Sequence, residues 1–103
     1  MKIAVATLSK GTNSQVADNA GRAPYYTVFG EQGEYLESMS NPFHIGGGGA
    51  GFGVAKMLAD KGVSIVVAGK LGANMKAALI SRGLEFQERK GVAQEVALEI
   101  LKK

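Results

Sequence analysis

The chain has 103 residues, with 15 glycines, no cysteine, and 12 basic residues against 9 acidic ones, a net charge of +3. This length is typical of one domain, spanning residues 1–103, and a hydrophobic content of 46% is enough for a packed core. The lack of cysteine excludes disulfides, thiolate-ligated zinc or iron-sulfur centres and a cysteine nucleophile. The basic residues are scattered, which argues against nucleic acid binding. No apolar run approaches the roughly 20 residues that cross a bilayer, so we expect a cytoplasmic protein with no membrane partner.

The first half of the chain predicts three strands. Ile3–Leu8 is almost continuously apolar and β-branched, which is typical of a strand buried on both faces in the middle of a sheet. The stretch that follows, up to Pro24, is rich in turn-forming residues and is expected to be a loop. Tyr25–Phe29 and Tyr35–Ser40 then predict a hairpin, whose second strand has the mixed pattern of a sheet edge.

A glycine-rich run at residues 46–53 leads into a predicted helix over Val54–Lys61, whose buried face could include Ala50. Gly62 is expected at the C-terminal cap of this helix. Val63–Ala68 is a second apolar strand, so strand, helix and strand form a parallel crossover unit.

The remaining sequence predicts a helix over Ala73–Arg82, an edge strand over Leu84–Glu88 and an amphipathic helix over Val92–Leu101. The order is βββαβαβα, which makes an α/β fold with a five-stranded mixed sheet. Right-handed crossovers place the two apolar strands side by side in the centre, with the hairpin on one side and the last strand on the other. This is the three-layer arrangement of ribonuclease-H-like domains.

Ligands of open α/β sheets usually bind outside the carboxyl ends of the parallel strands. Three segments should meet there: the loop after the first strand, the glycine-rich run and Gly69–Asn74. Both helix starts would direct unpaired backbone N–H groups at one crevice, and Arg22 and Lys70 could add positive charge. The sequence therefore predicts a shallow site for an anionic ligand.

Several familiar sites are disfavoured. Gly46, Gly48 and Gly51 satisfy a dinucleotide-binding spacing, but so would many glycine-rich runs, and the motif does not follow the first strand. The phosphate-loop pattern fails because no Lys and Ser or Thr follow the glycines. The run could instead be a loop of small residues that lets the helix pack close to the sheet.

Catalytic and metal sites are also poorly supported. His44 is the single histidine; it could ligate a metal, but one imidazole does not make a zinc site, and an exposed loop histidine is the simpler interpretation. A serine triad has no Gly-x-Ser-x-Gly turn. A two-metal nuclease needs several converging carboxylates, and the first strand carries none. We therefore expect no enzymatic activity.

Arg22 stands in a distinctive setting, between Gly21 and Pro24 just before a predicted strand. The glycine and proline restrict the backbone and direct one cation toward the strand ends. The alternative is an exposed turn arginine paired with Asp18.

The sequence resembles the dinitrogenase iron-molybdenum cofactor biosynthesis family over essentially its whole length. The residues that carry the resemblance, in order, are Met1–Ala6, Gly21–Tyr25, Asn41–Pro42, Gly49–Gly51, Leu58–Val63, Ala68–Gly72 and Leu79–Gly83. The resemblance implies a ribonuclease-H-like fold. It also implies a protein that binds or carries iron-molybdenum cofactor, or its iron-sulfur precursor, without catalysing a reaction.

Such clusters are anionic, so a crevice lined by helix starts and basic side chains suits them. Where many members of the family read His-Phe-Gly-Arg-Ala, this chain has Asn19-Ala20-Gly21-Arg22-Ala23, so direct ligation of iron would rest on His44. The alternative is a protein-interaction or small-anion-sensing module that has lost metal binding. The candidate cofactor-binding residues are Asn19, Arg22, His44, Gly48, Gly49, Gly51, Lys70 and Gly72.

Overall fold

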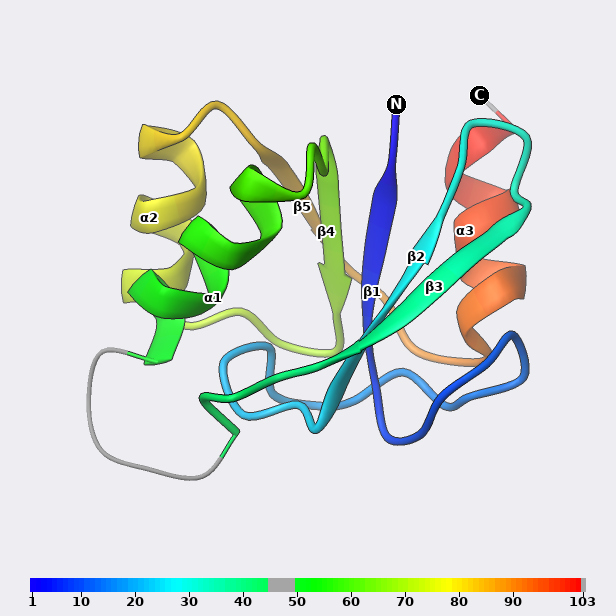
Figure 1. The fold of residues 1–103 in the computed structure, drawn as a ribbon, viewed down its shortest axis with the longest axis horizontal. Helices are drawn as coiled ribbons and strands as arrows, with labels where there is room; N and C mark the ends of the chain where they lie inside the picture. Colours follow the sequence, from blue (N-terminus) through cyan, green and yellow to red (C-terminus); the bar gives the residue numbers. More distant parts are fainter. Residues whose placement is uncertain (45–49, 103) are drawn as a thin grey trace.

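The computed structural model describes residues 1–44 and 50–102. All eight predicted elements are present in the predicted order (Figure 1). The strands run in the order β3-β2-β1-β4-β5, and β1 pairs antiparallel with β2 and parallel with β4, which confirms the ribonuclease-H-like arrangement. The elements are β1 Ile3–Thr7, β2 Tyr25–Phe29, β3 Tyr35–Ser40, α1 Ala50–Asp60, β4 Ile65–Ala68, α2 Ala73–Ser81, β5 Glu85–Glu88 and α3 Ala93–Leu101.

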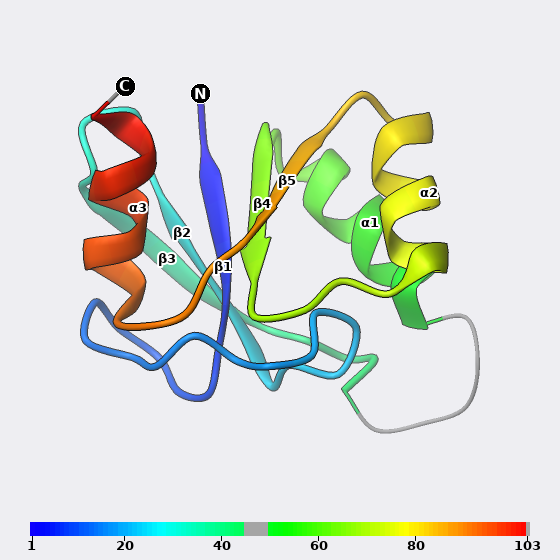
Figure 2. The same cartoon turned by 180° about the vertical axis from the view of Figure 1, so that it is seen from behind.

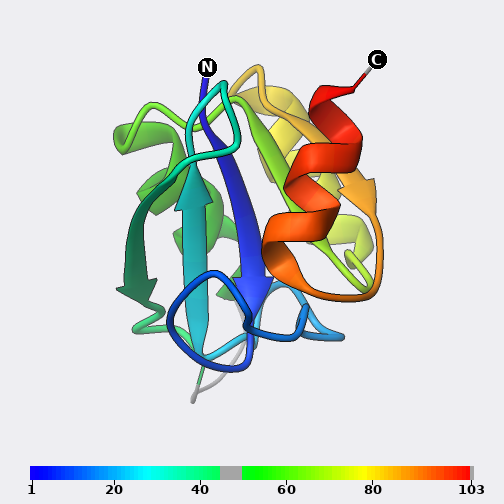
Figure 3. The ribbon, with the colours of Figure 1, turned by 90° about the vertical axis from the view of Figure 1, so that its right-hand side faces the viewer.

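The sheet is the middle of three layers, with α1 and α2 on one face and α3 on the other (Figures 1 and 2). Along β1, Ala4 and Ala6 belong to the core under α1 and α2, whereas Ile3 and Val5 belong to the core under α3. Helix α3 contacts β1 and β2, as the view from that side shows (Figure 3). Burial on both faces explains why β1 and β4 are almost entirely apolar.

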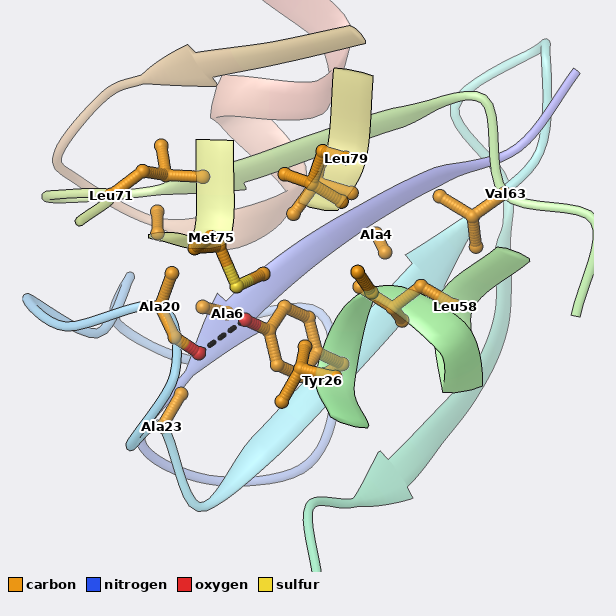
Figure 4. Packing of buried hydrophobic residues seen from close by; sticks show 14 of the residues in the cluster. Ala4, Ala6, Ala20, Ala23, Tyr26, Leu58, Val63, Leu71, Met75 and Leu79 are labelled. Atoms are coloured by element: carbon orange, nitrogen blue, oxygen red, sulfur yellow. Dashed lines mark hydrogen bonds between the residues drawn. The ribbon is translucent and has the colours of Figure 1, made fainter. Parts of the chain in front are cut away.

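The core under α1 and α2 combines small residues on the central strands with large ones around them (Figure 4). Alanines of β1 leave room for the Tyr26 ring of β2, which packs with Leu58 of α1 and with Met75 and Leu79 of α2. All four large side chains are almost completely buried. These contacts hold α1 and α2 against the same face of the sheet.

The main correction concerns the start of α1, which begins at Ala50 rather than Val54. The predicted loop residues Gly51 and Gly53 therefore belong to the helix. A Cβ atom on Gly51 would lie 3.2 Å from the Cα of Met75, so glycine allows α1 and α2 to approach closely at this point. Glycine has no side chain, so a helix contact made through glycines produces no hydrophobic periodicity in the sequence. This part of the helix therefore could not be predicted from the pattern of apolar residues.

The other boundaries shift by one or two residues. Leu8 is exposed beyond the end of β1, and Val63 and Leu84 precede their strands as buried residues. Gly62 and Gly83 have φ of 79° and 75° and follow α1 and α2, as caps of this kind require. Within the described residues, no helix combines the length and the apolar character needed to cross a membrane.

Candidate functional site

The segment between β1 and β2 closes the end of the sheet where the sequence predicts an open crevice. The Ala17 N–H donates to the Ala6 carbonyl oxygen at 2.7 Å, and the Gly69 N–H donates to the Ala17 carbonyl oxygen at 2.9 Å. The Ala20 N–H in turn donates to the Lys70 carbonyl oxygen at 3.0 Å. The segment therefore bridges the carboxyl ends of β1 and β4, and the available space lies in two clefts with shared walls.

The larger cleft, of about 620 Å³, lies beside the ends of β4 and β5. Its charged walls are Lys70, which follows β4, and the ion pair of Lys90 with Asp18, whose Nζ–Oδ1 distance is 2.6 Å. Among the described residues, the exposed Lys70 ammonium has no hydrogen-bond or ion-pair partner. The cleft is lined by Asp18, Asn19, Gly69, Lys70, Leu71, Gly72 and Lys90.

Glu88 of β5 holds the loop that forms one wall of this cleft. Its Oε2 atom accepts a hydrogen bond from the Leu71 N–H at 2.9 Å, and the Leu71 side chain is buried. Lys76 of α2 lies 4.0 Å from the same oxygen. The Glu88 carboxylate thus anchors the loop at Gly69–Gly72. Its role is structural and not that of a group that binds a ligand.

The smaller cleft, of about 320 Å³, lies between the starts of α1 and α2. Gly72 precedes the first turn of α2, and no side chain caps that end of the helix. The first-turn N–H groups of a helix have no partner within the helix, so they carry partial positive charge toward this cleft. The cleft is lined by Asn19, Gly21, Arg22, Gly51, Gly72, Ala73, Asn74 and Met75.

Buried side chains fix the backbone that carries Arg22. The Asn41 side-chain amide, almost fully buried, donates to the Gly21 carbonyl oxygen at 3.2 Å and to the Ala23 carbonyl oxygen at 2.8 Å. The Tyr26 hydroxyl donates to the Ala20 carbonyl oxygen (Figure 4). Burial raises the pKa of Tyr26 far above its usual value, so the hydroxyl stays protonated and remains a donor.

The structure brings Asn19, Arg22, Gly51, Lys70 and Gly72 to the same end of the sheet, as walls of one or both clefts. Asn19 and Gly72 line both. The expected positions Gly48 and Gly49 lie outside the described residues.

His44 lines neither of these clefts. It is exposed, and its Nδ1 atom lies 3.0 Å from the Asn41 carbonyl oxygen. That contact is a hydrogen bond when Nδ1 carries the proton, which leaves the Nε2 lone pair for a ligand. Within the described residues, no group of three or more His, Cys, Asp or Glu side chains is placed to hold a metal ion.

Asp18 and Lys90 are the charged wall residues that the sequence reasoning missed. Lys90 follows β5, a parallel strand whose carboxyl end lies beside that of β4. The rule that pointed to the residues after β4 applies equally to those after β5, and would have identified Lys90. The position of Asp18 depends on long-range backbone bonds of the bridging segment, for which the sequence has no visible signal.

The fold and the clefts define a ribonuclease-H-like α/β domain with two clefts at the carboxyl end of its sheet, whose described charged lining residues are mostly basic. The chain belongs to the dinitrogenase iron-molybdenum cofactor family, whose model matches residues 1–103. No curated protein matches the chain.

Two similar solved structures support the same fold. The apo form of the orange protein from Desulfovibrio gigas is 26% identical, with a TM-score of 0.86 over 95% of this chain and 83% of that one. A putative NifB protein from Thermotoga is 25% identical, with a TM-score of 0.80 over 96% of this chain and 85% of that one.

Proposed function

We propose that this protein is a small, non-catalytic binding or carrier protein for an anionic metal cluster, either iron-molybdenum cofactor or an iron-sulfur precursor. Membership of the dinitrogenase iron-molybdenum cofactor family supports the class of ligand. The observation that carries the proposal is the charge of the two clefts. Their described lining residues include three cationic side chains, Arg22, Lys70 and Lys90, and one carboxylate, Asp18, which amounts to a net charge of +2.

The proposed mode of binding is electrostatic. Backbone N–H groups at the start of α2 and the Lys70 ammonium provide hydrogen-bond donors for sulfide or oxygen atoms of a cluster. His44 is the one imidazole that could supply a direct ligand, from outside the two clefts. Weak direct ligation suits a carrier, because a cluster held mainly by charge can be passed on.

A non-catalytic role is supported by the make-up of the cleft walls. Two-metal or general acid-base chemistry needs converging carboxylates or a histidine. Among the described residues that line the two clefts there is only one such group, Asp18, and it is paired with Lys90.

The second candidate is a small-anion-sensing or protein-interaction module on the same scaffold. It is favoured by Asn19, an amide where many family members carry histidine, and by the absence of cysteine from the chain. Such a module would bind simple anions in the same clefts but would not retain a cluster.

The deciding experiment is anaerobic incubation with extracted iron-molybdenum cofactor, followed by gel filtration and analysis of iron and molybdenum in the protein peak. We expect both metals to co-elute, and Lys70→Gln to lower their retention about threefold to tenfold. Lys56→Gln is the matched control, because Lys56 is an exposed lysine on α1 that pairs with Asp60 and lines neither cleft. Absence of both metals from the wild-type peak would leave the anion-sensing candidate.

A further inference from the structure

The ion pair between Asp18 and Lys90 forms part of the wall of the larger cleft. Asp18 belongs to the loop after β1 and Lys90 to the loop after β5, and both side chains line the cleft. The Asp18 side chain is 82% exposed and that of Lys90 72% exposed. A ligand in the cleft would therefore meet both charges directly.

This ion pair is not needed to hold the two loops together. The Val16 N–H donates to the Gly91 carbonyl oxygen at 2.9 Å, and the Ala93 N–H donates to the Ser14 carbonyl oxygen at 2.8 Å. These backbone bonds already join the same two segments within a few residues of the pair. Exposed ion pairs also contribute little to stability. The main physical effect of Asp18 is thus on the charge that the cleft presents.

We propose that Asp18 is a specificity-determining residue of the larger cleft, which lowers the preference of the cleft for highly charged anions by neutralising Lys90. This inference rests on the proposed function in one respect, namely that the cleft binds anions. With Asp18 present, the charged walls sum to +1, carried by Lys70; without it they sum to +2. A more highly charged anion gains more from the lysines but is also repelled more strongly by the Asp18 carboxylate.

The test uses two tetrahedral oxoanions of nearly equal size and different charge, perrhenate (−1) and tungstate (−2). Their affinities are measured by NMR titration of the backbone amides of Gly69 and Gly72, for wild-type protein and for Asp18→Asn. Coulomb energy is proportional to ligand charge, so removing one negative charge should tighten perrhenate binding about threefold and tungstate binding about tenfold. Asparagine keeps the shape of the side chain.

Asp60→Asn is the matched control. Asp60 is also an exposed aspartate in an ion pair, with Lys56 at 2.8 Å, but it lines none of the cleft. It should leave both affinities unchanged. Equal effects of Asp18→Asn on the two anions, no effect, or an effect matched by Asp60→Asn would each overturn the proposal.

The outcome is separable from that of the cofactor experiment. If the tungstate-to-perrhenate preference rises in Asp18→Asn while no cofactor co-elutes with the wild type, the role of Asp18 stands and the carrier function fails. If the cofactor co-elutes but the wild-type cleft binds neither oxoanion, the role of Asp18 is overturned and the carrier function stands.

Discussion

A Cβ atom on Gly69 would lie 3.0 Å from the Cα atom of Asp18. It would also lie 3.2 Å from the Ala17 carbonyl oxygen, so the residue after β4 and the bridging segment meet backbone to backbone. Neither side of this contact can yield by rotating a flexible side chain. The contact fixes the bridging segment across the carboxyl ends of β1 and β4, where it borders the larger cleft.

Gly69→Ala should therefore destabilise the protein by about 1–3 kcal/mol, because the added methyl group forces a backbone shift. The measurement is the free energy of unfolding in urea at constant pH. Gly72→Ala is the matched control: its φ is −71° and no described atom would lie within 4 Å of the new Cβ, so the change should cost at most about 1 kcal/mol, the preference for glycine over alanine at a helix N-cap. Equal effects of the two substitutions would contradict the account of this contact.

Tyr26→Phe should cost about 1–3 kcal/mol of stability, because it leaves the Ala20 carbonyl oxygen buried without its donor. The same urea measurement checks this value. Tyr35→Phe removes a hydroxyl that bonds Ser38 at the exposed edge of the sheet and should change stability by less than about 0.5 kcal/mol. A Tyr26 variant as stable as the Tyr35 variant would mean that this bond does not support the loop that carries Arg22.

The hydrogen bond from Lys90, together with its charge, holds the pKa of Asp18 below the ordinary 3.8. Because the pKa is lower in the folded state, the stabilising contribution of Asp18 is present above about pH 3.8 and is lost as the pH falls through the folded-state pKa. A carboxyl-detected NMR titration should show the Asp18 pKa rising toward 3.8 in Lys90→Gln. Lys56→Gln should instead raise the pKa of Asp60, whose carboxylate it faces. An Asp18 pKa that does not respond to Lys90→Gln would show that the pair is not formed in solution.

Glu88→Ala should speed the hydrogen exchange of the Leu71 amide, because that amide loses its acceptor. Glu88→Gln keeps an acceptor oxygen at the same place and should retain most of the protection. Amide exchange followed by NMR distinguishes the two variants. Equally fast exchange of the Leu71 amide in both variants would mean that the charge of Glu88, rather than its hydrogen bond, holds the loop at Gly69–Gly72.

The strand order follows from the sequence because the central strands are buried on both faces. Continuous apolar runs at Ile3–Leu8 and Val63–Ala68 can only be neighbours in the middle of the sheet, and the mixed patterns of Tyr35–Ser40 and Leu84–Glu88 belong at its edges. Helix α2 begins at the predicted Ala73, since Gly72 and the apolar spacing after it mark the boundary. The strand order and the start of α2 are thus determined by residues within each element, which is why the sequence predicts them.

The site is less predictable, because it depends on long-range backbone contacts. The segment around Ala17 reads as an ordinary loop, yet its backbone bonds to Ala6 and Gly69 divide the expected crevice. The pairing of Asp18 with Lys90 joins residues 72 positions apart, and no local pattern encodes it. Lys70 is predictable because it lies two residues beyond the end of an apolar strand.

The most direct test of the central claim uses the paramagnetism of the cofactor itself. Protein labelled with ¹⁵N is titrated anaerobically with extracted iron-molybdenum cofactor, and the broadening of each backbone amide signal is recorded. Bound cluster should broaden Asn19 and Gly72, which line both clefts, most strongly, and should spare Gly30 and Gly33 in the hairpin turn at the opposite end of the sheet. Broadening centred on the hairpin, or none at stoichiometric cofactor, would contradict the proposal that these clefts hold an anionic cluster.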